Sequence, residues 1–207
     1  MKKSDFIILV DMDDVLENLQ EAWIARLNEK FKRNVDWTKV TDWNVEIYYP
    51  PLTKEQALSP LFEDNFWNTV KPKDDSIKIL KNLYEENYSI YLVTSSAYST
   101  LTNKFSQALW PYFPFIKENN IIITNCKQLI RGHVLIDDGV HNLINKPFKP
   151  SYYKILFTAN TNRNFNTVGT DIKRVSNWYE IYSIIERLFE IENELESLQK
   201  QKEKTDI

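Results

Sequence analysis

Five aspartates stand in two groups, each directly after an apolar run of the sequence. Asp11, Asp13 and Asp14 follow the first run, and Asp137 and Asp138 follow a later one. Carboxylates held close together repel one another, so such groups are tolerated mainly beside a bound cation. Oxygen ligands favour magnesium, which proteins usually hold through one or two carboxylates and a substrate phosphate. The two groups therefore predict a Mg²⁺ site that serves phosphate chemistry.

Each aspartate group also has a simpler interpretation. A single Asp after a strand is a common helix cap, although three carboxylates within four residues fit that role poorly. The pair Asp137 and Asp138, taken alone, is as typical of a cap followed by a turn as of a metal site. Which of the two would contact a metal stays open.

Side chains that can hold phosphate lie between the two groups. Thr94 and Ser95 follow an apolar run, and Lys127 precedes the run that leads to the second aspartate group. Taken singly, hydroxyls after a strand are more often caps, and a lysine is usually solvated. At a strand end, however, hydroxyls and free backbone N–H groups can bind phosphate oxygens, and a lysine offsets their charge.

The elements that must position these residues are short strands separated by helical segments. Continuous apolar runs of strand length are typical of strands buried on both faces; they cover residues 6–10, 88–93, 121–123, 134–136 and 155–157. Apolar residues at helical spacing lie between most of them. This alternation predicts an α/β fold with a parallel sheet and right-handed crossovers. Ligands of such sheets bind at the carboxyl ends of the strands, where the polar side chains stand.

Two segments differ from the main domain, which we assign to residues 1–32 and 71–188. Residues 33–70 are dense in aromatic residues and lack strand periodicity, which predicts a small helical cap inserted after the first strand. Residues 189–207 form a helical tail. The C-terminal helix is predicted to begin at a capping box of Asn177 and Glu180.

The C-terminal helix carries a heptad-like apolar seam, Ile181, Ile184, Leu188, Ile191, Leu195 and Leu198. One interpretation is a helix that packs back on its own domain as far as Leu188. The other is a partner-bound helix beyond that point, for which a homodimer is the simplest case.

Composition limits the functional classes. The net charge is -3 and the pI about 5.6, with no basic stripe of the kind that binds a nucleic-acid duplex. One cysteine, Cys126, cannot form an internal disulfide, which favours a reducing compartment. No apolar stretch approaches the roughly 20 residues of a membrane span. We expect a cytoplasmic protein that does not bind membranes.

The ordered set of motifs resembles the haloacid dehalogenase (HAD) superfamily of phosphohydrolases. Asp-x-Asp, Thr-Ser, a lysine and Asp-Asp occur here in the superfamily's order. Within it the chain is most similar to the 5'(3')-deoxyribonucleotidases of the cytosolic type C group. That similarity extends over about residues 6–188 and includes the segments 65–67, 155–157, 162–164 and 174–178. It implies a Rossmann-like HAD sheet flanked by helices.

The resemblance also implies roles. Asp11 would be the nucleophile that forms an aspartyl-phosphate, and Asp13 the general acid and base. Thr94, Ser95 and Lys127 would bind the phosphoryl oxygens. Mg²⁺ would be held by Asp11, the backbone carbonyl of Asp13, and Asp137 or Asp138. Asp14 departs from the family, which often has glycine at that position.

The cap is the expected specificity element. Its aromatic residues Trp43, Phe66 and Trp67 are candidates for stacking on a nucleobase, although a small helical subdomain also needs aromatics for its own core. The expected substrate is a (deoxy)nucleoside monophosphate. Two alternatives remain: a HAD phosphatase for another small ester such as a sugar phosphate, and a non-catalytic module that binds magnesium or phosphate.

Overall fold

The computed structural model describes residues 1–144 and 149–205. Its centre is a sheet in which every neighbouring pair of strands is parallel, in the order β3-β2-β1-β4-β5-β6. The strands are β1 (Ile7–Val10), β2 (Ser89–Thr94), β3 (Ile121–Ile123), β4 (Arg131–Asp137), β5 (Ser151–Phe157) and β6 (Ile172–Val175). The predicted α/β fold is confirmed, and β6 is an addition to the five predicted strands.

Strand β1 is buried on both faces of the sheet, which explains its continuous apolar sequence. Ile8 and Val10 belong to the larger core cluster, and Leu9 to a second cluster on the opposite face. This is the period-two alternation of a strand. Helices α3 (Ser76–Glu85) and α6 (Trp178–Thr205) contribute to the larger cluster, as does α4 (Tyr98–Lys104). The short α5 (Val140–Leu143) contributes to the second cluster.

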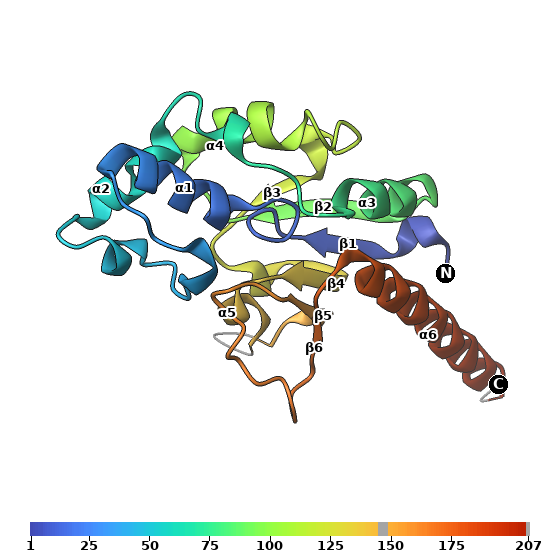
Figure 1. Ribbon diagram of the computed structural model, residues 1–207. Helices are drawn as coiled ribbons and strands as arrows, with labels where there is room; N and C mark the ends of the chain where they lie inside the picture. The colour runs from blue at the N-terminus through green and yellow to red at the C-terminus, as the bar shows by residue number, and fades with distance from the viewer. Residues whose placement is uncertain (145–148, 206–207) are drawn as a thin grey trace.

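The inserted cap is joined to the sheet domain by two segments that run side by side. Asn18 N donates to the carbonyl of Lys71 at 2.8 Å, and Lys73 N donates to the carbonyl of Leu16 at 2.9 Å. Between these points lie α1 (Leu19–Phe31), α2 (Lys54–Leu58) and several short 3-10 turns. Figure 1 shows α1 and α2 together beyond one end of the sheet.

Helix α1 packs on the inserted segment. The indole of Trp23 donates to the carbonyl of Ala57 at 2.8 Å, and the hydroxyl of Tyr49 donates to the carbonyl of Ile24 at 3.2 Å. The sequence assigned α1 to the main domain and residues 33–70 to the cap. We propose instead that the cap comprises residues 19–70, because its connections to the sheet domain lie just outside that range.

Helix α6 begins as predicted. The N–H of Glu180 donates to the side-chain oxygen of Asn177 at 3.0 Å, which caps the helix. Its first turns are buried against the domain through Leu188, whereas Leu195 and Leu198 are 46% and 54% exposed. Beyond that point the helix extends away from the sheet (Figure 1), and the N-terminal ammonium of Met1 still donates to Asn193 and Glu196. Packing as far as Leu188 is confirmed, and a homodimer through the tail stays a prediction.

Within the described ranges, none of the helices combines the length and apolar character that crossing a bilayer requires.

Candidate active site

The predicted site residues meet at the carboxyl ends of four neighbouring strands. Asp11 follows β1, Ser95 follows β2, Lys127 lies in a 3-10 turn (Lys127–Leu129) after β3, and Asp137 ends β4. The N–H of Asp11 donates to the carbonyl of Ile136 at 2.9 Å, which extends the β1–β4 pairing to the nucleophile candidate. Together they surround a pocket of about 210 Å³, lined by Asp11, Asp13, Trp43, Ser95, Lys127, Asp137, Asp138, Gly139, His141 and Asn142.

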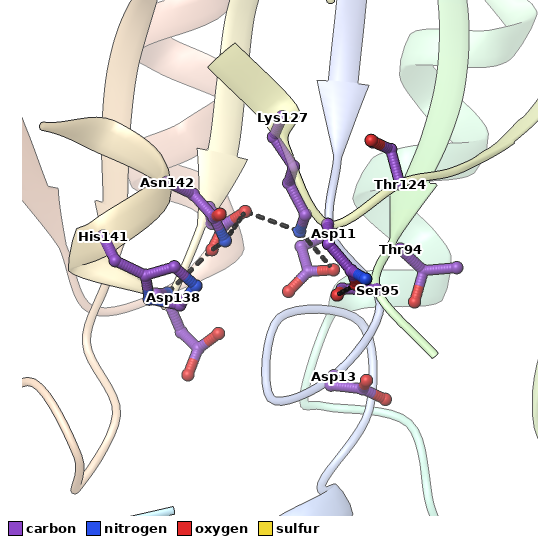
Figure 2. A network of polar contacts seen from close by, with 12 residues as sticks. Asp11, Asp13, Thr94, Ser95, Thr124, Lys127, Asp138, His141 and Asn142 are labelled. Carbon is purple, nitrogen blue, oxygen red and sulfur yellow. Dashed lines mark hydrogen bonds and ion pairs between the residues drawn. The ribbon is translucent and has the colours of Figure 1, made fainter. Parts of the chain in front are cut away.

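Lys127 bridges the two aspartate groups. Its Nζ lies 2.7 Å from Asp11 Oδ1 and 2.7 Å from Asp137 Oδ2, and Figure 2 shows its side chain reaching toward Asp11. Burial by itself lowers the pKa of Lys127, but the charges of the two carboxylates outweigh it, so the pKa is raised. Lys127 is therefore a fixed positive charge at the floor of the pocket.

Three buried carboxylates form a candidate cation site. Ligand oxygens of Asp11, Asp137 and Asp138 all lie within 4.8 Å of one another. Burial, only partly opposed by Lys127, raises the pKa of Asp11 to about 7. Burial, together with the charges of Asp11 and Asp137, also raises the pKa of Asp138 well above its usual value. Carboxylates that resist ionisation in this way are what a divalent cation stabilises.

Asp137 and Asp138 differ in how their oxygens are used. Asp137 accepts hydrogen bonds from Lys127 and the N–H of Gly139 at 2.7 Å each, and from the Asn142 amide at 3.1 and 3.2 Å. Asp138 Oδ2 is buried and has no hydrogen-bond partner in the described part of the chain. A buried oxygen without a hydrogen-bond partner, close to two other carboxylates, is well placed to bind a cation.

Gly139 leaves room for this arrangement. A Cβ atom at this position would lie 2.8 Å from His141 Cε1 and 3.0 Å from Asp137 Oδ1. Both distances are shorter than ordinary van der Waals contact. A side chain here would therefore push on the carboxylate that holds Lys127.

Asp13 contacts a lysine that sequence reasoning missed. Lys104, the last residue of α4, is 0% exposed, and its Nζ lies 2.7 Å from the Asp13 carboxylate. The signal was its spacing: Lys104 lies three residues after Leu101 and four before Ala108, inside the apolar stripe of the helix. Glu17, also missed, is buried beside Asp13; burial first, and then the charge of Asp13, raise its pKa well above the usual value.

The two predicted phosphate-binding hydroxyls occupy different positions. Ser95 lines the pocket, and its hydroxyl donates to the side-chain oxygen of Asn125. Thr94 is fully buried, and its Oγ1 accepts from Lys104 Nζ at 3.2 Å. Thr94 therefore reaches the site through Lys104, while Ser95 faces it directly (Figure 2).

The three aromatic candidates of the cap also differ in whether they reach the pocket. Trp43 lines the pocket and stacks on Trp23, with ring centroids 6.3 Å apart. Phe66 and Trp67 are only 2% and 3% exposed and pack edge to face against each other. In this structure they belong to the larger hydrophobic cluster, which the cap shares with the sheet domain, and do not line the acidic pocket.

Asp14 does not line the pocket either. Its φ is 54°, a left-handed conformation that glycine adopts more easily, in keeping with the family's frequent glycine. Its carboxylate accepts the N–H of Gln20 at 3.2 Å and so caps the first turn of α1.

Solved structures show which fold the chain has. A HAD family hydrolase from Deinococcus radiodurans R1, solved with phosphate and sodium, has a TM-score of 0.58 at 14% identity, covering 89% of this chain and 97% of its own. A HAD hydrolase from Bacillus subtilis, bound to magnesium, has a TM-score of 0.54 at 13% identity, covering 87% and 98%. The chain has the HAD fold.

Relatives in sequence narrow the class to a family. Residues 5–189 match the family described as "5' nucleotidase, deoxy (Pyrimidine), cytosolic type C protein". The 5'(3')-deoxyribonucleotidase of Bacillus subtilis (strain 168) is 34% identical over 185 residues, covering 87% of this chain and 97% of the relative. That of Clostridium acetobutylicum is 30% identical over 179 residues, covering 86% and 94%. The chain belongs to the cytosolic type C 5'-nucleotidase family, and is a hydrolase of nucleotidase-like phosphatase type.

Proposed function

We propose that this chain is a Mg²⁺-dependent phosphomonoesterase that dephosphorylates (deoxy)nucleoside monophosphates through a phosphoryl-aspartate at Asp11. One observation carries the proposal: the buried carboxylate of Asp11 lies 2.7 Å from Lys127, in the pocket that Asp138 also lines. The relatives named 5'(3')-deoxyribonucleotidases support the choice of substrate. A cytoplasmic location stays a prediction.

The covalent step uses groups of the chain. A carboxylate oxygen of Asp11 attacks phosphorus, and the bond between phosphorus and the leaving alkoxide oxygen breaks. Asp13, on the same turn and at the pocket wall, gives a proton to that oxygen. Asp13 then takes a proton from a water that attacks phosphorus, the bond to Asp11 breaks, and inorganic phosphate leaves.

Lys127 and Ser95 account for binding of the phosphoryl group. Lys127 contacts two carboxylates in the described part of the chain and has three N–H donors, so one donor remains for a phosphoryl oxygen. Ser95 lines the same pocket, and its hydroxyl would turn from Asn125 to a phosphoryl oxygen. Positioning and fixed charge of this kind supply most of the catalysis in phosphoryl transfer. Thr94 does not face the phosphoryl group and instead accepts a hydrogen bond from Lys104.

The candidate cation site fits Mg²⁺. Asp11, the backbone carbonyl of Asp13, and Asp138 would hold it, with Asp137 kept for Lys127 and Asn142. When bound, the cation neutralises charge on the phosphoryl oxygens and favours the ionised form of Asp11.

The part of the cap that lines the pocket would select the substrate. Trp43 is the cap aromatic that lines the pocket, and its indole offers a flat surface for a base. A role of Phe66 and Trp67 in substrate contact stays a prediction, because both side chains are buried and neither lines the pocket in this structure.

Phosphate release from a panel of ribo- and deoxyribonucleoside monophosphates and sugar phosphates tests the proposal. We expect turnover that is concentrated on deoxynucleotides and lost in EDTA. Asp11→Asn should lower it roughly 10⁴-fold or more, whereas Asp5→Asn, an exposed aspartate at the other end of β1, should not. Turnover confined to sugar phosphates would keep the chemistry and overturn the substrate. Folded protein that binds Mg²⁺ without any turnover would favour a binding module.

A further inference from the structure

Lys104 places a fully buried positive charge behind Asp13. Its Nζ lies 2.7 Å from the Asp13 carboxylate, 2.7 Å from Ser96 Oγ and 3.2 Å from Thr94 Oγ1. A lysine ammonium has three N–H donors, and these three acceptors use all of them. Lys104 does not line the pocket. Unlike Lys127, it therefore has no donor left for a substrate phosphate.

The surroundings of Lys104 hold it in this place. The face of the Trp67 ring lies 5.3 Å from Nζ, a cation–π contact from the cap. An ammonium buried without a partner would be strongly unfavourable, and within the described ranges the Asp13 carboxylate is the partner in its one ion pair. Removing the Asp13 carboxylate would therefore leave the ammonium buried and uncompensated.

Asp13 is held between this buried charge and the pocket. Its side chain is 19% exposed and lines the pocket, while Lys104 and the buried Glu17 lie against it. Figure 2 shows its carboxylate turned away from Asp138 and the candidate cation site. A proton-transfer group must stay within hydrogen-bond reach of the reacting oxygen, and small misplacements reduce rates strongly.

We propose that Lys104 is a positioning residue that fixes the carboxylate of Asp13 for proton transfer to the leaving oxygen. The inference rests on the proposed phosphatase function and concerns one step of it. Lys104 acts through Asp13 and does not touch the substrate. Lys127, by contrast, binds the phosphoryl group itself.

The basicity of the leaving group separates these two roles. p-Nitrophenyl phosphate releases a weakly basic phenolate that needs no proton, whereas phenyl phosphate, nearly the same in shape, releases a more basic one. Deoxyuridine 5'-monophosphate releases a still more basic alkoxide. Loss of an acid that protonates the leaving group therefore affects the last two substrates and spares the first. Loss of a phosphate contact affects all three.

The experiment compares kcat/KM of Lys104→Met with that of the wild type on the three substrates. We expect phenyl phosphate and deoxyuridine 5'-monophosphate to lose about 10- to 100-fold more than p-nitrophenyl phosphate, a part of the 10²–10⁴-fold that general acids typically contribute. Lys104→Arg, which keeps the charge, should recover much of the difference. Equal losses on all three substrates, or no loss on the nucleotide, would overturn the inference.

Two reference variants complete the test. Asp13→Asn should show the same leaving-group pattern more strongly, and Lys127→Met should lower all three substrates alike. The ratio between substrates does not depend on how much of a preparation is folded. If Lys104→Met is insoluble, Ser96→Ala removes one of its hydrogen bonds and should give a smaller change of the same kind. If the wild-type protein is inactive on every substrate, the proposed function is wrong. If the protein is active but Lys104→Met leaves the ratios of kcat/KM between substrates unchanged, only this inference is wrong.

Discussion

Asp137 and Asp138 are neighbours in the chain with opposite surroundings. Asp137 accepts hydrogen bonds from Lys127, Gly139 and Asn142, so its charge is compensated by the protein. Asp138 has an oxygen without a partner among the described residues, and its pKa is raised. Asp137 therefore stabilises the fold of the site, and Asp138 is better suited to the cation.

Replacing each aspartate by asparagine should separate the two roles. Asp137→Asn breaks a buried ion pair, which typically costs 3–5 kcal/mol, so the melting temperature should fall. Asp138→Asn removes a repelled carboxylate, so the metal-free protein should keep its stability, while half-saturation with Mg²⁺ should shift at least about 10-fold upward. Thermal unfolding and Mg²⁺ titration check both. The reverse pattern would assign the cation to Asp137.

The packing of the cap decides which of its aromatic side chains can reach the pocket. Trp43 reaches the pocket only because α1 and the inserted turns pack together, with Trp43 on Trp23. Phe66 and Trp67 look equally suitable in the sequence, but they are buried in the hydrophobic cluster that the cap shares with the sheet domain.

Trp43→Ala should therefore raise KM for nucleotides. Stacking of a base on an aromatic side chain contributes about 1–3 kcal/mol, so an increase of about 10-fold is expected, with little change for p-nitrophenyl phosphate. Phe62→Ala, an exposed aromatic of the same cap, is the matched control. Steady-state kinetics on both substrates measure the effect. An equal KM for wild type and Trp43→Ala would place the base elsewhere.

What the sequence predicts about these elements depends on how local the cause is. The apolar runs of β1 and β4 indicate buried strands directly. The aspartates that follow them indicate the site in the same local way. Strand β6 has the sequence Ile-Lys-Arg-Val, half polar because it lies at the sheet edge, and gave no strong signal. The pairing of Lys104 with Asp13 joins residues 91 positions apart, so no local pattern contains it.

At the scale of the whole molecule, the buried acidic site makes the stability of the fold depend on pH. In the metal-free protein the pKa is about 7 for Asp11 and about 6 for Asp14, both above the ordinary value of 3.8. The folded state then binds protons more tightly than the unfolded state. The stability from these groups is fully present below about pH 3.8 and is lost progressively as the pH rises from there to about 7.

Mg²⁺ should therefore stabilise the protein more at pH 8 than at pH 5. The cation binds ionised carboxylates, and at pH 5 it must displace protons from them. Thermal unfolding with Mg²⁺ and with EDTA at both pH values gives the two shifts in melting temperature. A shift that is equal at both pH values, or larger at pH 5, would contradict the assignment of Asp11 and Asp138 as ligands.

The most direct test of the account is to find the phosphoryl group on Asp11. Wild-type protein is mixed with phosphate-labelled deoxyuridine 5'-monophosphate and Mg²⁺, quenched in acid within a turnover, and reduced with borohydride, which converts a phosphorylated aspartate to homoserine. We expect homoserine at position 11 of the wild type, and none in Asp11→Asn. Turnover without label on the protein, or label on another residue, would contradict it.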